Sequence, residues 1–176
     1  IPQVHYLLVG KGEDQARVRG LVEAHQLQDC VTLTGFIPDG ELADHYRLCD
    51  VFAMPSQGEG FGIVYLEGLA CGKPTLGGNQ DGAIDALCQG HLGALVSPDD
   101  INQIATTLVD MLWGTYPNPL IYQPQLLREK TLATYGFAQF KATLASHLAQ
   151  GTGPASPALT RPRSEEHTSE LQSPYV

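Results

Sequence analysis

Short apolar runs alternate with amphipathic segments along most of the chain. Residues 4–9 (VHYLLV) form an apolar run that ends at Gly10, which is typical of a buried parallel strand. Residues 13–27 then place apolar side chains at helical spacing, with polar residues between them. The same alternation continues downstream. It predicts strands near residues 31–34, 50–54, 74–76 and 92–96, and helices near residues 39–48, 63–70, 81–87 and 98–113.

At least five strand–helix alternations predict an α/β fold, a doubly wound parallel sheet with helices on both faces. Two more helical patterns, near residues 125–134 and 137–149, predict C-terminal helices. We therefore expect one domain over residues 1–150. Residues 151–162 are rich in Gly, Pro and Ser, which predicts a flexible linker. Residues 163–176 (RSEEHTSELQSPYV) resemble the translation of a common sequencing-library adapter, so we expect an artefactual, disordered tail.

Charge and composition exclude several classes of function. The net charge is −9, and the chain has only ten Lys and Arg. The sequence shows no basic patch, so neither a nucleic-acid partner nor polybasic membrane attachment is expected. The six His and four Cys show no metal-ligand spacing, so no metal site is expected. The cysteines are typical of reduced, mostly buried thiols, and no signal peptide or long apolar run is present. These features predict a cytoplasmic protein.

Glycines follow four of the predicted strands. They are Gly10 with Gly12, Gly35, the loop Gly58 to Gly62, and Gly77 with Gly78. Ligands of doubly wound sheets bind at the carboxyl ends of the strands. The last two loops lead into helices, whose free N–H groups suit phosphate. Each glycine alone is explained by a tight turn, but four glycine-bearing strand ends favour a ligand site.

Two carboxylates flank the third of these loops. Glu59 lies in the loop and Glu67 on the following helix. Eight helical steps would separate them by about 12 Å, whereas the paired carboxylates of glycosidases lie roughly 5–9.5 Å apart. We therefore expect each carboxylate to hold a different group, because carboxylates accept hydrogen bonds from sugar hydroxyls, including ribose diols.

The residues around this pair carry a specific resemblance. The segments concerned are Pro55-Ser56, Glu59 to Gly62, Leu66 to Ala70 and Gly72 to Pro74. Together they are similar to the signature of the family 4 glycosyltransferases, which have the GT-B fold and an E-x7-E motif. The resemblance extends over roughly residues 4–149 and implies a Rossmann-like C-terminal half of a GT-B fold.

The resemblance implies a retaining hexosyltransferase that takes a sugar from a nucleoside-diphosphate-sugar donor without a cofactor or metal. It implies that Glu59 is the catalytic residue in contact with the donor sugar and that Glu67 binds the ribose hydroxyls. The backbone at Gly60, Phe61 and Gly62 would meet the sugar or distal phosphate. The remaining donor-binding residues implied are Gly10 and Gly12, which let the nucleotide approach, and Gly35, Phe36 and Ile37, which border the base.

Two departures from the family pattern matter. The family usually has an Arg and a Lys near the start of this domain, and no matching pair is present. The family also often has a Glu after the Gly77-Gly78 position, where Asp81 and Asp85 are both candidates and the choice stays open. The chain opens on Ile1, just before a strand, so we expect a fragment without its acceptor-binding N-terminal domain.

Such a fragment is expected to bind nucleotide-sugar but to be inactive alone. Any association with the inner face of a membrane is expected to occur only through the missing half. Two alternatives stay open: a non-catalytic nucleotide-sugar-binding subunit completed by a separate acceptor-binding chain, and a sugar-nucleotide epimerase of the same fold. The E-x7-E match counts against the epimerase, because its chemistry needs acid–base groups instead.

Overall fold

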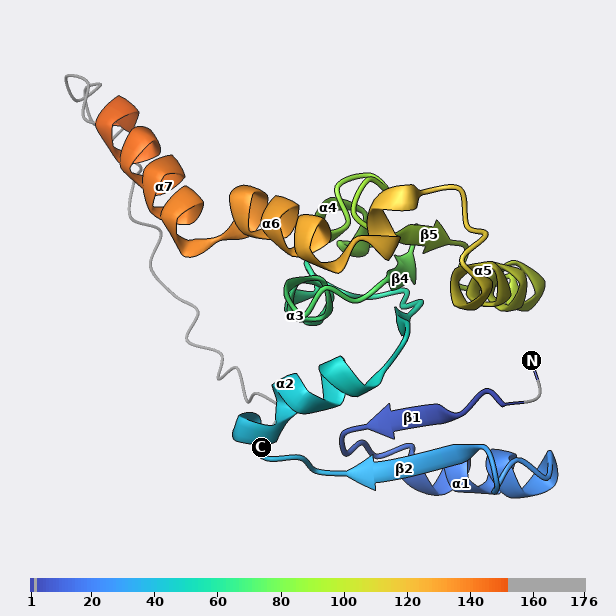
Figure 1. Ribbon diagram of the computed structural model, residues 1–176. Coiled ribbons are helices and arrows are strands. Elements are labelled where there is room, and N and C mark those ends of the chain that lie inside the picture. Colours follow the sequence, from blue (N-terminus) through green and yellow to red (C-terminus); the bar gives the residue numbers. More distant parts are fainter. Residues whose placement is uncertain (2, 152–176) are drawn as a thin grey trace, which may run out of the picture. The chain divides into compact units, whose positions relative to one another are not determined.

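The computed structural model describes residues 1 and 3–151 (Figure 1). The chain divides into two compact units, Ile1–Gln139 and a unit that begins at Phe140. The strands of the first unit are β1 (Tyr6–Val9), β2 (Val31–Gly35), β3 (Phe52–Met54), β4 (Thr75–Gly78) and β5 (Ala94–Val96). Its helices are α1 (Gln15–Ala24), α2 (Asp39–Leu48), α3 (Ile63–Ala70), α4 (Ala83–Ala86), α5 (Ile101–Trp113), the 3-10 helix η1 (Pro119–Tyr122) and α6 (Pro124–Tyr135).

All strand pairs are parallel, and each strand is followed by a helix, which confirms the predicted α/β fold. The strands form two sheets rather than one: β1 pairs with β2, and β4 lies between β3 and β5. Tyr6 is opposite Val31 in the first sheet, and Leu76 is flanked by Ala53 and Ala94 in the second. The parallel strands with flanking helices are therefore present, but in two separate sheets whose strands follow sequence order.

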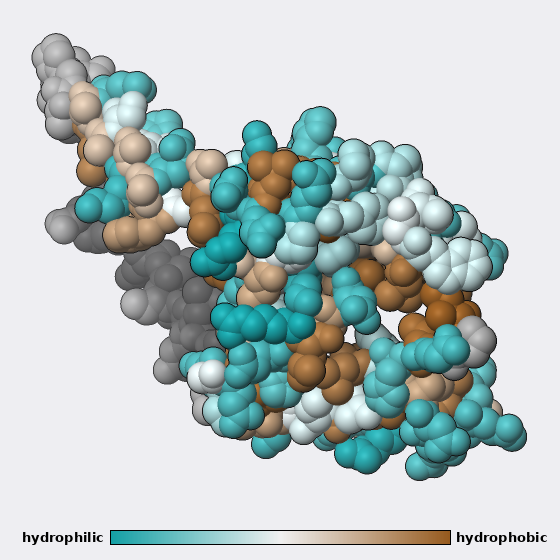
Figure 2. Space-filling view, in the orientation of Figure 1, coloured by the Kyte–Doolittle hydropathy of each residue, from teal (hydrophilic) through white to brown (hydrophobic). Residues whose placement is uncertain are grey.

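The two sheets differ in burial. All four residues of β4 are buried, as expected for an interior parallel strand. In β1, Tyr6 and Val9 are about half exposed, at 52% and 44%. The prediction of a buried strand at this position is therefore wrong. The reason is that β1 pairs only with β2 among the described strands, and that α1 buries no residue of its own. Apolar side chains accordingly appear among hydrophilic ones on the face shown in Figure 2.

The core of the first unit surrounds the three-stranded sheet. Tyr65 and Leu69 of α3 and Leu127 of α6 are fully buried in one cluster, which also includes residues of α4. This cluster packs α3 against α6. Leu76 and Val96 belong to a second cluster, which α5 and η1 complete through Met111 and Ile121. Each of these side chains contributes roughly 1.5–3 kcal/mol by leaving water. The loop ahead of α3 is thus supported by the best-packed part of the molecule.

Helix ends show where local sequence signals held. Gly72 adopts the left-handed conformation just past α3, at the expected position. Asp100 caps α5 by accepting a hydrogen bond from the Gln103 N–H at 2.9 Å. At the start of α2, Pro38 is the N-cap and Asp39 is the first residue of the helix. A carboxylate at this position is stabilised by the positive end of the helix dipole.

Helix α7 (Phe137–Gly151) begins in the first unit and forms the described part of the second. It confirms the helix predicted near residues 137–149, and its apolar side chains Phe140, Leu144 and Leu148 are about half exposed. The division between the two units lies near Gln139, and the single domain over residues 1–150 stays a prediction. The linker was expected at residues 151–162, and its first residue, Gly151, is the last residue of α7. The rest of that linker and the tail expected at residues 163–176 lie outside the described residues.

Candidate functional site

The loop that joins β3 to α3 is tightly fixed. The Tyr65 hydroxyl donates to the Met54 carbonyl at 2.7 Å and lies 3.2 Å from the Ser56 hydroxyl. Gly62 has φ +84°, and a Cβ there would lie 2.3 Å from the Tyr65 ring. Only glycine therefore fits between this ring and the loop. The buried Tyr65 thus shapes the loop that holds Glu59 and the predicted backbone contacts.

Unsatisfied donors gather at the start of α3. Gly62 is the N-cap of this helix and supplies no side-chain cap. The N–H groups of Phe61 and Gly62 make no hydrogen bond with another described residue. A helix N-terminus with free N–H groups and a positive dipole binds anions, phosphate in particular. The arrangement can therefore bind a phosphate without a side-chain cation.

Glu59 is held by its main chain. Its N–H donates to Asp81 Oδ2 at 2.9 Å, and its carbonyl accepts from the Gly82 N–H at 3.0 Å. Its carboxylate makes no hydrogen bond with another described residue. The Glu59 backbone is therefore fixed while its acceptor oxygens stay open to a ligand.

Glu67 lies on α3 and is oriented from α2. Its Oε2 accepts a hydrogen bond from the Tyr46 hydroxyl at 2.8 Å. Tyr46 is buried and packs edge-on against Phe52, with ring centroids 5.3 Å apart. Burial, together with the hydrogen bond to Glu67, raises the pKa of Tyr46, so it stays a neutral donor. The second Glu67 oxygen remains able to accept from a ligand hydroxyl.

The ends of β1 and β2 bring a second group of predicted residues together. The Gly10 N–H donates to the Gly35 carbonyl at 3.0 Å, with φ at +122° and +71° respectively. A Cβ at Gly10, Gly12 or Gly35 would meet no atom within 4 Å, so these positions border open space. Phe36 is 67% exposed, and Lys11 Nζ lies 5.6 Å from the centre of its ring. Ile37, next along the chain, is partly buried.

Four contributors to this geometry were not predicted as site residues. They are Ser56, Tyr65, Tyr46 and Lys11. Tyr46 comes from α2, and only the fold brings its hydroxyl to Glu67 on α3. Lys11 stands between two predicted glycines, and only the fold brings its ammonium over Phe36. Of the two open candidates, Asp81 contacts the Glu59 loop. The exposed Asp85 carboxylate accepts, among the described residues, only from Gln89 at 3.4 Å.

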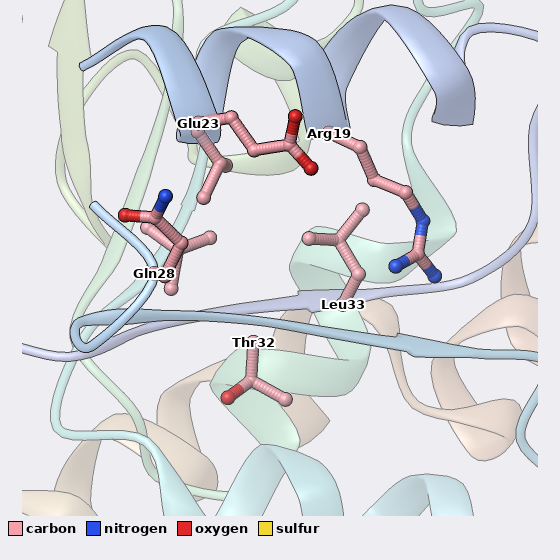
Figure 3. A pocket seen from close by; sticks show the side chains of 7 residues that line it. Arg19, Glu23, Gln28, Thr32 and Leu33 are labelled. Carbon is pink, nitrogen blue, oxygen red and sulfur yellow. The ribbon is translucent and has the colours of Figure 1, made fainter. Parts of the chain in front are cut away.

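A separate pocket of about 290 Å³ lies between α1 and β2 (Figure 3). Its lining residues are Arg19, Val22, Glu23, Gln28, Val31, Thr32 and Leu33. None of them is a predicted site residue, and none belongs to the strand-end loops. The candidate site is therefore the loop–helix segment from Ser56 to Glu67 rather than this pocket.

Residues 1 and 3–151 contain neither a cluster of metal ligands nor a helix that could cross a membrane. No group of three or more His, Cys, Asp or Glu there is placed to hold a metal ion. No helix in the same part of the chain has the length and apolar character needed to cross a membrane.

Sequence comparison identifies the family. Residues 1–114 match the family model described as "Glycosyl transferases group 1". This chain belongs to that family. A GDP-mannose-dependent alpha-(1-6)-phosphatidylinositol monomannoside mannosyltransferase from Mycolicibacterium smegmatis is 34% identical over 119 residues, 64% of this chain and 31% of the relative. A D-inositol 3-phosphate glycosyltransferase from Thermobispora bispora is 40% identical over 86 residues, 49% of this chain and 20% of the relative. This group 1 chain thus spans about a third or less of these relatives.

Solved structures of other proteins have the same fold as this member of the group 1 family. Sucrose-phosphate synthase from Thermosynechococcus elongatus matches with a TM-score of 0.72 at 29% identity, over 85% of this chain and 39% of that one. The C-terminal domain of a glycosyl transferase group 1 protein, LpcC from Francisella tularensis, matches with a TM-score of 0.62 at 25% identity, over 76% and 70%. Alr3699/HepE from Anabaena, solved with UDP, matches with a TM-score of 0.72 at 24% identity, over 85% and 42%. The chain therefore has the fold of a glycosyltransferase C-terminal domain.

Proposed function

We propose that the chain is the donor-binding domain of a retaining hexosyltransferase that uses a nucleoside-diphosphate-sugar and no metal. The observation that carries this proposal is the segment from Glu59 to Glu67. Here the Glu59 carboxylate and the second Glu67 oxygen flank the N–H groups of Phe61 and Gly62, which have no partner among the described residues. Carboxylates suit sugar hydroxyls, and the helix terminus between them suits phosphate. The order of these groups along the segment matches the order sugar, diphosphate, ribose in such a donor.

In this proposal each group has one task. Glu59 is the catalytic residue and contacts the donor sugar, while the backbone of Gly60, Phe61 and Gly62 meets the distal phosphate. Fixed N–H dipoles stabilise the negative charge that develops on the departing diphosphate, and they need no reorganisation during the reaction. This stabilisation is the main catalytic contribution of the chain.

The nucleoside end of the donor is assigned to Glu67 and to the ends of β1 and β2. Glu67 accepts hydrogen bonds from the ribose hydroxyls, with Tyr46 fixing its orientation. Gly10 and Gly12 leave room for the nucleotide, and the backbone from Gly35 through Phe36 to Ile37 borders the base. The M. smegmatis relative is named as GDP-mannose-dependent, and several structural neighbours were solved with UDP or UDP-glucose. GDP and UDP are therefore the two probes to use.

The testing experiment is calorimetric titration of the chain with GDP and with UDP. We expect one of them to bind, and we expect Glu67→Ala to weaken that binding roughly tenfold or more, since a hydrogen bond to a charged group is lost. Glu129→Ala, an exposed carboxylate on α6, is the matched control and should leave the affinity unchanged. If neither nucleotide binds the wild-type chain, the proposed function is wrong. An unchanged affinity in Glu67→Ala removes Glu67 from the ribose role.

A further inference from the structure

Asp81 makes contacts in the site that the proposed donor chemistry does not use. Its Oδ2 accepts from the Ser56 hydroxyl at 2.6 Å and from the Glu59 N–H at 2.9 Å. Its Oδ1 accepts from the Ala83 N–H at 3.0 Å. Both oxygens are therefore engaged by the protein, and this carboxylate is already occupied rather than free for a ligand. The Asp85 carboxylate, in contrast, accepts a hydrogen bond from Gln89 at 3.4 Å, outside the Glu59 loop.

Gly82, the next residue after Asp81, also contacts the loop that carries Glu59. Its N–H donates to the Glu59 carbonyl at 3.0 Å, so two consecutive residues bind both polar groups of the Glu59 backbone. A Cβ at Gly82 would lie 2.2 Å from the Gly60 carbonyl oxygen and 2.7 Å from Phe61 Cα. The two backbones are in direct contact, so only glycine fits at this position. Asp81 and Gly82 together are called the Asp81–Gly82 clamp below.

The clamp acts on the one residue whose side chain must aim at the sugar. A fixed N–H and a fixed carbonyl determine the direction of the Glu59 Cα–Cβ bond. The N–H groups of Phe61 and Gly62 lie further along the loop, where Gly62 packs against the Tyr65 ring. Catalytic groups need placement within about 0.5 Å, which requires this kind of support from a second layer of residues.

We propose that Asp81 is a positioning residue for the donor sugar, acting through Glu59. This inference rests on the proposed function, because it assigns Glu59 to the sugar, and it adds a residue to that site. Without the Asp81 carboxylate, the Glu59 loop keeps only the Gly82 contact and the Tyr65 support on its other side. Glu59 then samples several directions, and the sugar loses its contact while the nucleoside keeps its own.

The charge state of Asp81 fits this role. Desolvation by burial raises the pKa of Asp81, but hydrogen bonds from Ser56 and from the N–H groups of Glu59, Ala83 and Gly58 outweigh it and lower the pKa overall. The ionisable groups near it are Glu59 in the loop and Tyr65 on α3. A depressed pKa means that the clamp is complete above the ordinary Asp pKa of about 4 and is lost as pH falls through the lower folded value.

The first measurement needs no nucleotide. Amide hydrogen exchange by NMR reports the protection factors of the Glu59 and Gly82 N–H groups in the wild-type chain, Asp81→Ala, Asp81→Asn and the control Asp85→Ala. We expect protection of the Glu59 amide to fall roughly tenfold or more in both Asp81 variants, with β4 and β5 amides unchanged. Asp81→Asn keeps the side-chain volume, so it serves if Asp81→Ala does not fold. Unchanged protection in both variants overturns the proposal.

The second measurement separates positioning from general destabilisation. The affinity for GDP is compared with that for GDP-mannose, and the affinity for UDP with that for UDP-glucose. For the pair that binds, the affinity for the sugar-bearing ligand divided by that for the bare nucleotide measures the sugar contact. We expect Asp81→Asn to remove most of the preference for the sugar-bearing ligand while the bare nucleotide binds within about twofold of wild type, because separated contacts contribute nearly independently. A merely structural role would weaken both ligands alike.

A double-mutant cycle with Glu59→Ala completes the test. If Asp81 acts through Glu59, Asp81→Asn adds nothing to Glu59→Ala in the sugar preference. Additive losses contradict the proposal. A wild-type chain that binds neither nucleotide disproves the proposed function and the sugar role of Asp81 with it. The exchange measurement still shows separately whether the clamp exists.

Discussion

The two carboxylates of the candidate site are held in different ways. Glu59 is fixed through its own backbone by the Asp81–Gly82 clamp, and its carboxylate makes no hydrogen bond with another described residue. Glu67 has one oxygen bound by the Tyr46 hydroxyl. The first residue is thus aimed by the loop that carries it, and the second by a side chain from another helix. The two supports can be removed separately.

The hydroxyl of Tyr46 can be deleted without changing the packing of its ring. In Tyr46→Phe we expect nucleotide binding to weaken roughly fivefold, because the Glu67 carboxylate is no longer held in one orientation, at a cost of about 0.5–1.5 kcal/mol. Calorimetric titration with GDP or UDP measures this change. Tyr122→Phe is the control, since its hydroxyl also donates, to the Asp110 carbonyl, but belongs to the other core cluster. Equal affinities in Tyr46→Phe and wild type would contradict the orienting role.

The sequence marked the residues that carry the site more completely than those that support it. Glu59, Glu67 and the glycines stand out because their types and spacing suit sugar and phosphate. Asp81 was only one of two candidates for the usual Glu. The contacts of Asp81, Ser56 and Tyr65 were not predicted, because they join positions up to 25 residues apart and depend on the backbone path between them. The assigned roles of the site residues stay predictions until ligand binding is measured.

At the scale of elements, helices α3 and α5 both end on a left-handed glycine. Gly72 and Gly114 have φ of +72° and +74°. Their surroundings differ: a Cβ at Gly114 would meet nothing within 4 Å, whereas one at Gly72 would lie 2.9 Å from the Pro124 carbonyl oxygen at the start of α6. The end of α3 is therefore also a packing contact between two helices.

This difference predicts unequal costs for the same substitution. Gly114→Ala should lower the free energy of unfolding by about 1 kcal/mol, the cost of a left-handed conformation for a residue with a Cβ. Gly72→Ala should cost about 1–3 kcal/mol more, because the backbone of α6 must also shift. Urea unfolding of both variants measures the two values. Equal losses would show that the α3–α6 contact adjusts freely.

Element bounds followed closely from the hydrophobic pattern, but their surroundings did not. Helix α2 spans the expected residues, whereas α4 is only four residues long and η1 was not expected at all. The apolar run of β1 predicted a buried strand, yet Tyr6 is half exposed. Periodicity reports what a segment is suited to, and burial depends on which neighbours actually pair with it.

At the scale of the whole molecule, the chain spans about a third or less of the relatives described above. Its described residues contain the strand ends and the loop–helix segment assigned to the donor. No residue among them has been assigned to an acceptor. We therefore expect this chain to bind a donor without transferring its sugar, since proximity of two substrates supplies much of the rate of a transferase.

This expectation is measured by donor consumption. GDP-mannose and UDP-glucose are incubated with the chain and a panel of sugar and polyol acceptors, and the released nucleoside diphosphate is quantified by chromatography. We expect release at the level of a sample without protein. Sustained, acceptor-dependent release by this chain would show that it contains a complete active site, and would remove the need for a second domain.

The contact between Gly82 and the Gly60–Phe61 backbone has a consequence for engineering donor choice within this family. If only the loop is replaced by that of a related transferase, it must still fit against Asp81 and Gly82 of this chain. The two backbones are in direct contact there, so no side chain can move to relieve a mismatch. Residues 56–62 and 81–83 therefore form one transplantable unit, although 18 positions of chain separate them (63–80). Chimeras and libraries should exchange or randomise these two segments together.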